Sequence, residues 1–125
     1  MTMTECSILI VDDDYLIATE LSVHLRASGF EVLGPFARAE DARRALADTR
    51  PDGVFLDINL GEGRTSYALA NELRKRGIPF AFISGYSAVP EDKAEFDEIR
   101  LLTKPVDPDH AIAEARYLCG EIGAS

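Results

Sequence analysis

Polar side chains that could act in one reaction stand at the ends of four apolar segments of this chain. They are two acids after the first segment, one at the end of the third, a hydroxyl after the fourth and an amine after the fifth: Asp12, Asp13, Asp57, Ser84 and Lys104. Clustered carboxylates raise one another's pKa unless a cation neutralises them, and Mg²⁺ prefers such oxygen ligands. A carboxylate nucleophile can form an aspartyl-phosphate, while an ammonium and a hydroxyl can bind phosphoryl oxygens. These residue types therefore predict a Mg²⁺ site at which a carboxylate can accept a phosphoryl group.

The segments that carry these residues have the composition of buried parallel strands. Continuous runs of β-branched and other apolar residues are typical of strands that are covered on both faces. The predicted strands are 6–11, 30–34 (where Pro35 ends the segment), 54–57, 79–83 and 99–102. Because ligands bind at the carboxyl ends of the strands in open α/β sheets, we expect the polar residues at one edge.

Helical signals fill the intervals between the predicted strands. Apolar residues recur at helical spacing, and glycines that stop helices follow several of these segments. The predicted helices are 15–28, 39–48, a third from Thr65 or Ser66 to about 76, a short one at 88–96 and a last one at 108–118. Strands that alternate with helices predict an α/β fold, (βα)5, with a doubly wound, five-stranded parallel sheet and right-handed crossovers.

Composition places the chain among globular proteins and argues against several partners. Of its 125 residues, 46% are hydrophobic and 28% are charged, which predicts a single domain, 1–125, without an output domain. The formal net charge of −9 argues against direct binding to nucleic acid or to an anionic membrane. The apolar runs are too short for a membrane helix and residues 1–5 lack signal-peptide features, so a cytoplasmic location is expected.

The two cysteines lie near opposite ends of the sequence. Cys6 and Cys119 do not have the spacing that is typical of a metal site. We interpret both as small buried hydrophobic side chains without a redox role.

The motifs around the polar residues resemble those of one known family. They are Ile-Val-Asp-Asp-Asp at 10–14, Leu-Asp at 56–57, Ile-Ser-Gly at 83–85 and Thr-Lys-Pro at 103–105. In this order, and over essentially the whole chain, they resemble the receiver domain of two-component response regulators. The resemblance implies a CheY-like, flavodoxin-like sheet with the strand order 2-1-3-4-5.

The resemblance also implies a role for each acid of the cluster. Asp57 corresponds to the phosphoacceptor and is itself a ligand of Mg²⁺. Asp13 corresponds to the direct Mg²⁺ ligand and Asp12 to the partner that acts largely through water. The backbone carbonyl of Asn59 corresponds to a further ligand of the metal.

The signalling residues of the family are matched in part. Ser84 corresponds to the switch hydroxyl, and Lys104 to the invariant lysine, whose bond to Pro105 is typically cis in the family. Many receivers carry an aromatic switch residue three positions before the lysine, where this chain has Leu101. The loop at 60–63 has Leu-Gly-Glu-Gly in place of the usual Met-Pro followed by Asp-Gly, which favours a more flexible loop.

A narrower resemblance concerns the fourth predicted strand. The segment 76–86 is similar to receivers of stress-response phosphorelays, which are often stand-alone and partnered by kinases of the HWE or a related type. The resemblances imply a stand-alone receiver that accepts a phosphoryl group from a histidine kinase or phosphotransfer protein and can pass it on. Phosphorylation would change the protein contacts of the face formed by 88–96, 99–102 and 108–118, in a monomer or a phosphorylation-dependent dimer.

Two other functions stay open at this point. A small phosphatase of the haloacid-dehalogenase type also uses an Asp-x-Asp motif, a hydroxyl, a lysine and Mg²⁺, and residues 12–14 loosely resemble that motif. Such a phosphatase would leave Asp57 without a role. A receiver-like interaction module that works without phosphate is kept open by Leu101, although the presence of all the acceptor residues argues against it.

Overall fold

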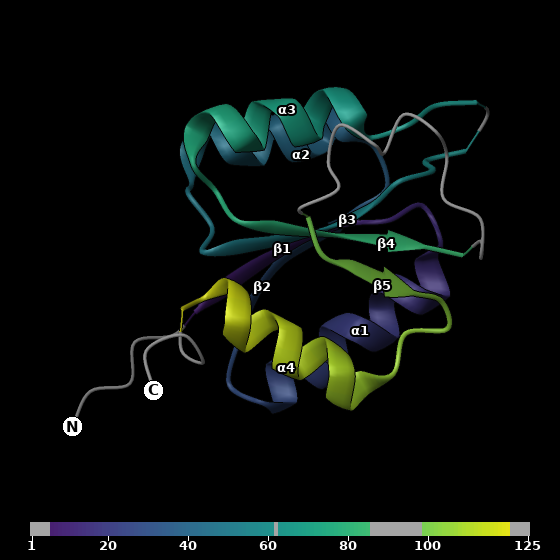
Figure 1. The fold of residues 1–125 in the computed structure, drawn as a ribbon, viewed down its shortest axis with the longest axis vertical. Coiled ribbons are helices and arrows are strands. Elements are labelled where there is room, and N and C mark those ends of the chain that lie inside the picture. The colour runs from purple at the N-terminus through teal and green to yellow at the C-terminus, as the bar shows by residue number, and fades with distance from the viewer. Residues whose placement is uncertain (1–5, 62, 86–98, 121–125) are drawn as a thin grey trace.

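Five parallel strands form one sheet in the computed structural model, which describes residues 6–61, 63–85 and 99–120 (Figure 1). The order of the strands in the sheet is β2-β1-β3-β4-β5, and each neighbouring pair is parallel. The α/β class and the strand order expected from the sequence are therefore confirmed. The strands are β1 (Ser7–Val11), β2 (Glu31–Phe36), β3 (Gly53–Asp57), β4 (Phe80–Ser84) and β5 (Leu101–Thr103).

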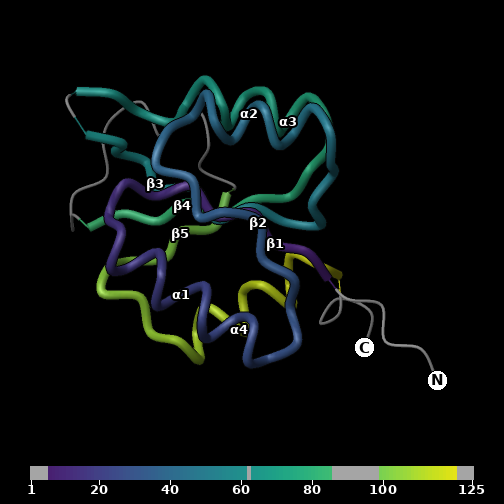
Figure 2. Tube along the Cα trace, turned by 180° about the vertical axis from the view of Figure 1, so that it is seen from behind, coloured from purple at the N-terminus to yellow at the C-terminus, as the bar shows by residue number. Residues whose placement is uncertain are grey.

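Four helices of the described residues cover the two faces of this sheet (Figure 1, Figure 2). One face carries α1 (Tyr15–Ala27) and α4 (Pro108–Leu118), and the other carries α2 (Ala39–Asp48) and α3 (Tyr67–Arg76). The predicted limits of α2 and α4 agree with the structure, whereas the short helix predicted at 88–96 lies outside the described residues. Within the described part of the chain, no helix combines the length and the apolarity needed to cross a membrane.

Each face of the sheet has its own apolar core. Successive residues of a strand point to opposite faces, so β1 contributes to both cores. Ile8 and Ile10 pack with α1 and α4, whereas Leu9 and Val11 pack with α2 and α3. All residues of β3 are buried, as its continuous apolar run predicts. The central strand that carries Asp57 is thus held from both sides.

The second strand is longer than the sequence predicts. Pro35 does not end it, because β2 continues to Phe36, and the bond between Gly34 and Pro35 is cis. β2 is an edge strand, where proline can be accommodated without loss of a ladder hydrogen bond. The Phe36 carbonyl accepts a hydrogen bond of 2.9 Å from the Asp12 backbone N–H. The added length of β2 therefore fixes the backbone of the first acid after β1.

Other element limits differ from the predicted ones by about a residue. β4 and β5 each end one residue later than predicted, at Ser84 and Thr103, because these two residues still pair with each other. α3 begins directly after Ser66, as expected, although the Ser66 hydroxyl forms no capping hydrogen bond. The side chains of Asp14 and Asp107 do cap α1 and α4, each by accepting a hydrogen bond from a backbone N–H of the first turn.

The interpretation of both cysteines as small buried hydrophobic side chains without a redox role is wrong. Cys6 is buried as expected, but it forms a disulfide with Cys119, and their Cα atoms are 6.2 Å apart. Cys6 directly precedes β1 and Cys119 directly follows α4, two chain ends that lie side by side (Figure 1). The pairing spans 113 residues of sequence and results from the topology of the sheet, so spacing along the chain gives no sign of it.

We predict that Gly53→Ala destabilises the fold, because α4 approaches β3 closely at this position. An added Cβ at Gly53 would lie 2.8 Å from the Leu118 Cβ, whereas one at Gly85 would lie 3.6 Å from the Lys104 Cδ, an ordinary contact. Overpacking of this kind costs about 1–3 kcal/mol. Urea unfolding should show that loss for Gly53→Ala and a near wild-type value for the control Gly85→Ala. Equal stabilities of the two variants would contradict this packing of α4.

Candidate functional site

The registers of the sheet bring the carboxyl ends of its strands to one level. Asp57 pairs with Ile83 of β4, and Ser84 pairs with Thr103 of β5. β1 and β3 are likewise in register, so that Asp12, which follows β1, lies beside Asp57. The polar residues predicted from the sequence therefore gather at the edge where parallel α/β sheets bind ligands.

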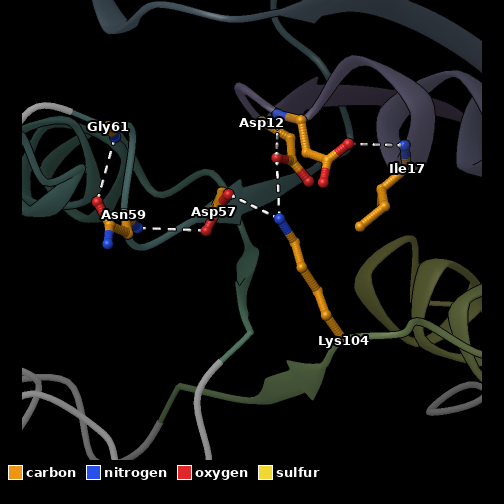
Figure 3. Close-up of polar contacts among 7 residues, drawn as sticks. Asp12, Ile17, Asp57, Asn59, Gly61 and Lys104 are labelled. Atoms are coloured by element: carbon orange, nitrogen blue, oxygen red, sulfur yellow. Dashed lines mark hydrogen bonds and ion pairs between the residues drawn. The ribbon is translucent and has the colours of Figure 1, made fainter.

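The Lys104 ammonium joins two of the carboxylates, as Figure 3 shows. Its Nζ atom lies 3.1 Å from Asp12 Oδ1 and 3.0 Å from Asp57 Oδ2. Only 15% of the Lys104 side chain is exposed, and both carboxylates are almost fully buried. One ammonium balances one negative charge, so two ionised carboxylates at this position would keep a net negative charge in a poorly solvated place.

This charge imbalance changes the pKa of both partners. Burial and the neighbouring Asp12 raise the pKa of Asp57 to about 7, although Lys104 acts in the opposite direction. Burial lowers the pKa of Lys104, but hydrogen bonds and charges from Asp57 and Asp12 outweigh burial and raise that pKa above its ordinary value. Lys104 therefore keeps its charge at neutral pH, while Asp57 stays close to its titration midpoint unless more positive charge arrives.

A third carboxylate completes an oxygen-rich cluster. Carboxylate oxygens of Asp12, Asp13 and Asp57 lie within 4.8 Å of one another. Asp12 Oδ1 accepts hydrogen bonds from Lys104 and from the Asp14 backbone N–H, but Asp12 Oδ2 is buried and has no hydrogen-bond partner among the described residues. A buried carboxylate oxygen without a partner is costly, and a hard divalent cation compensates it. The three residues thus fit Mg²⁺, both in their chemistry and in the oxygen left without a partner.

The loop after β3 holds the Asp57 carboxylate (Figure 3) and leaves space for Asp13. The Asn59 backbone N–H donates to Asp57 Oδ1 at 3.2 Å, and the Asn59 side-chain oxygen accepts from the Gly61 N–H at 3.1 Å. Gly61 has a φ of 86°, and an added Cβ there would lie 2.9 Å from Asp13 Oδ2. The sequence of 60–63 predicts a flexible loop. The structure instead requires glycine at position 61 because of its positive φ and its close approach to Asp13. Asn followed two residues later by Gly is the signal of such a turn.

The remaining predicted residues lie around the cluster. Ser84 is buried at the end of β4, and its carbonyl accepts a hydrogen bond of 2.8 Å from the Lys104 N–H. The bond between Lys104 and Pro105 is cis, as the resemblance implies. Leu101 is half-buried and packs against the core under α2 and α3. The Asn59 carbonyl as a metal ligand and the Ser84 hydroxyl as a phosphoryl ligand stay predictions.

A cleft of about 490 Å³ opens over Asp57 at this edge, with mostly polar walls. Gly85 leaves the wall beside Lys104 without a side chain, and the exposed Asp13 stands at the mouth. A phosphoryl group can therefore reach Asp57 from solvent. The cleft is lined by Asp13, Asp14, Asp57, Asn59, Gly61, Gly85 and Lys104.

The arrangement of the acids does not favour the phosphatase alternative. That alternative requires Asp12 and Asp14 to act together, but Asp13 is the residue that joins Asp12 and Asp57. The Asp14 carboxylate instead accepts a hydrogen bond of 3.2 Å from the Ile17 N–H and so caps α1. Asp57, which the phosphatase would leave without a role, lies at the centre of the cluster.

Comparison with known proteins relates most of the chain to one family. The model of the response regulator receiver domain matches residues 8–116. The chain is 34% identical over 108 residues to the sensory transduction protein LytT of Bacillus cereus, covering 84% of the chain and 44% of LytT. It is 34% identical over 122 residues to the transcriptional regulatory protein PrrA of Mycobacterium leprae, covering 94% and 52%. The chain thus spans about half the length of the curated relatives it matches.

The solved structures agree with this relationship. A putative response regulator from Chloroflexus aurantiacus J-10-fl superposes with a TM-score of 0.80 at 25% identity, covering 94% of this chain and 99% of that one. The family match, the strand order and the lysine-linked acids at the carboxyl edge all point the same way. This chain belongs to the response regulator receiver domain family, the phosphoacceptor domains of two-component signalling.

Proposed function

We propose that the chain accepts a phosphoryl group on Asp57 from a histidine kinase or a histidine phosphotransfer protein, in a reaction that depends on Mg²⁺. One observation carries this proposal above the others. The Asp57 carboxylate is buried beside a lysine and two further acids, yet it faces an open cleft. Such a carboxylate is held in place, activated by neighbouring charge and accessible to a donor.

The chain's own residues supply the nucleophile and its surroundings. An Asp57 carboxylate oxygen attacks the phosphorus of a phosphohistidine, the P–N bond breaks, and the imidazole leaves and takes up a proton from solvent. Lys104 donates to a phosphoryl oxygen, and the Ser84 hydroxyl donates to another. When bound by Asp12, Asp13, Asp57 and the Asn59 carbonyl, Mg²⁺ supplies positive charge that neutralises the phosphoryl oxygens.

Exposed apolar side chains beside the cleft favour docking of a protein donor. Tyr15 and Leu16 begin α1, directly after the acids, and their exposed fractions are 75% and 76%. Large apolar side chains in such a position are often part of a contact surface. We assign them to the contact with the kinase or phosphotransfer protein, because that contact must form next to Asp57.

The output of the proposed receiver is a change in protein contacts or onward transfer of the phosphoryl group. Phosphorylation adds roughly two negative charges next to Asp12 and Asp13. Lys104 must then redistribute its hydrogen bonds, which shifts the population between two states of the face that includes β5 and α4. The proposal includes a cytoplasmic receiver domain that is monomeric or dimerises on phosphorylation. This domain binds neither nucleic acid nor membrane, and it catalyses only its own phosphorylation and dephosphorylation.

Labelling with acetyl phosphate tests the acceptor. We expect the wild type to gain the mass of one phosphoryl group in the presence of Mg²⁺ and none after chelation, by intact mass spectrometry. Asp57→Asn should lose the label, because an amide is not a nucleophile here. Asp48→Asn, the same exchange at an exposed residue of α2, should keep it.

Two results would contradict the proposal. Label that persists in Asp57→Asn would place the acceptor elsewhere. A folded wild type that takes no label while a second receiver is labelled in parallel would favour the phosphate-independent interaction module.

Stability measurements test the charge imbalance. The pKa of Asp57 is raised to about 7 in the folded protein, so the folded state binds this proton more tightly than the unfolded state does. In metal-free protein, the contribution of Asp57 to stability is therefore fully present below the ordinary aspartate pKa of about 3.9 and is lost as pH rises from there through about 7. We expect the stability advantage of Asp57→Asn over the wild type to grow by about 1–3 kcal/mol between about pH 5 and about pH 8.5.

Urea unfolding with a chelator at both pH values measures this difference between variant and wild type. The other titratable groups are the same in both proteins, so their contributions cancel in the stability difference between variant and wild type. Mg²⁺ should restore stability to the wild type at the higher pH and have little effect on Asp57→Asn. A stability difference between variant and wild type that does not change with pH would show that the pKa of Asp57 is not raised in the folded protein.

A further inference from the structure

The two cysteines of the chain lie together at the end of the sheet opposite the acids. Cys6 directly precedes the first residue of β1, whereas Asp12 directly follows its last residue. Cys119 follows the last residue of α4 and forms the disulfide with Cys6. We propose that this pair is a reversible thiol–disulfide modification site that responds to low-molecular-weight disulfides. The inference is independent of phosphorylation at Asp57.

Backbone hydrogen bonds and core packing hold both cysteines in addition to the disulfide. The Cys6 carbonyl accepts a hydrogen bond of 3.0 Å from the Glu31 N–H, and the Cys119 N–H donates to the Ala115 carbonyl at 3.0 Å. Both cysteines contact the core on the α1 and α4 side of the sheet. The Cα atoms are 6.2 Å apart, within the range of about 4.4–6.8 Å that disulfides span. The backbone contacts of both cysteines are therefore compatible with the closed bond.

Close contacts fix the end of α4 independently of the sulfur atoms. Leu118, the residue before Cys119, packs so closely on β3 that a Cβ at Gly53 would overlap it. Arg100, just before β5, forms an ion pair with the buried Glu114 of α4 and lies 4.3 Å over the ring of Tyr117. These contacts keep the last turn of α4 beside the start of β1 when the bond is open. The same pair can thus close again after reduction.

The exposure of the two sulfur-bearing residues gives the order of the exchange steps. Cys6 is buried, while Cys119 is only partly buried, so Cys119 meets the reagent first. The Cys119 thiolate attacks one sulfur of oxidised glutathione, whose S–S bond breaks and releases one glutathione thiolate. The Cys6 thiolate then attacks the Cys119 sulfur of the mixed disulfide and releases the second glutathione. Two thiols of the chain become one disulfide, and one oxidised glutathione becomes two reduced ones.

The fold does not need this bond in order to form. The five strands form one sheet with an apolar core on each face. A chain of this length buries enough apolar surface to fold without a disulfide. The bond therefore adds stability to a fold that is already complete, mainly by restricting the unfolded chain over a separation of 113 residues. Oxidation is expected to hold α4, part of the proposed output face, more firmly against the sheet.

Thiol counting and thermal unfolding of the full chain test the site. The protein is equilibrated with oxidised glutathione or with dithiothreitol, then denatured and alkylated, and its intact mass is measured. We expect no alkylated thiol in the oxidised sample and two in the reduced sample. The melting temperature of the oxidised form should be higher by at least about 5 °C, because the bond closes a long loop and so restricts the unfolded chain.

Cys6→Ser and Cys119→Ser provide matched controls for the bond. Each should lose the difference between oxidised and reduced melting temperatures. Comparing the two redox states of one variant cancels the packing cost of the substitution, so a destabilised variant still gives an answer. Ser28→Ala, at the end of α1, should keep the full redox difference.

Three results would overturn the inference. Two alkylated thiols after oxidation would show that the pair does not close. A glutathione adduct that stays on Cys119 would show that Cys6 cannot resolve it. Covalent dimers in place of the internal bond would show that the cysteines meet between chains.

Discussion

The buried ammonium of Lys104 between Asp12 and Asp57 is the interaction on which the site depends. Two carboxylates removed from water repel each other, and one ammonium balances only one of them. Burial and this imbalance raise the pKa of Asp57, and Asp12 Oδ2 has no hydrogen-bond partner in the described part of the chain. The site is therefore suited to take up positive charge next to Asp57, the proposed nucleophile, which is the property that phosphoryl transfer requires.

The rest of the fold maintains this arrangement. Parallel registers bring Asp57 level with the ends of β1 and β4, and the extended edge strand β2 fixes the backbone of Asp12. The turn at Asn59 and Gly61 holds the Asp57 carboxylate from the other side and leaves space for Asp13. α4 packs so closely on β3 that Gly53 cannot carry a side chain. This packing thus holds the start of the strand whose last residue is Asp57.

Local patterns in the sequence predict much of this structure. The apolar run that ends at Asp57 gives β3, the periodic segments 39–48 and 108–118 give α2 and α4, and the polar residues at strand ends give the cluster. Long-range features are different. Proline inside β2 is tolerated because that strand lies at an edge, which local sequence does not reveal. The pairing of Cys6 and Cys119 likewise exists only in three dimensions.

The measurement that tests this account most directly is a carbon-13 NMR titration of the Asp57 side-chain carboxyl in metal-free protein. The account predicts a midpoint near 7, from burial and the charge of Asp12, and a shift to lower pH when Mg²⁺ is added. A midpoint close to the ordinary aspartate value of about 3.9 in the absence of metal would contradict it. That result would mean that Lys104 alone neutralises the cluster and that the acids have no unmet need for a cation.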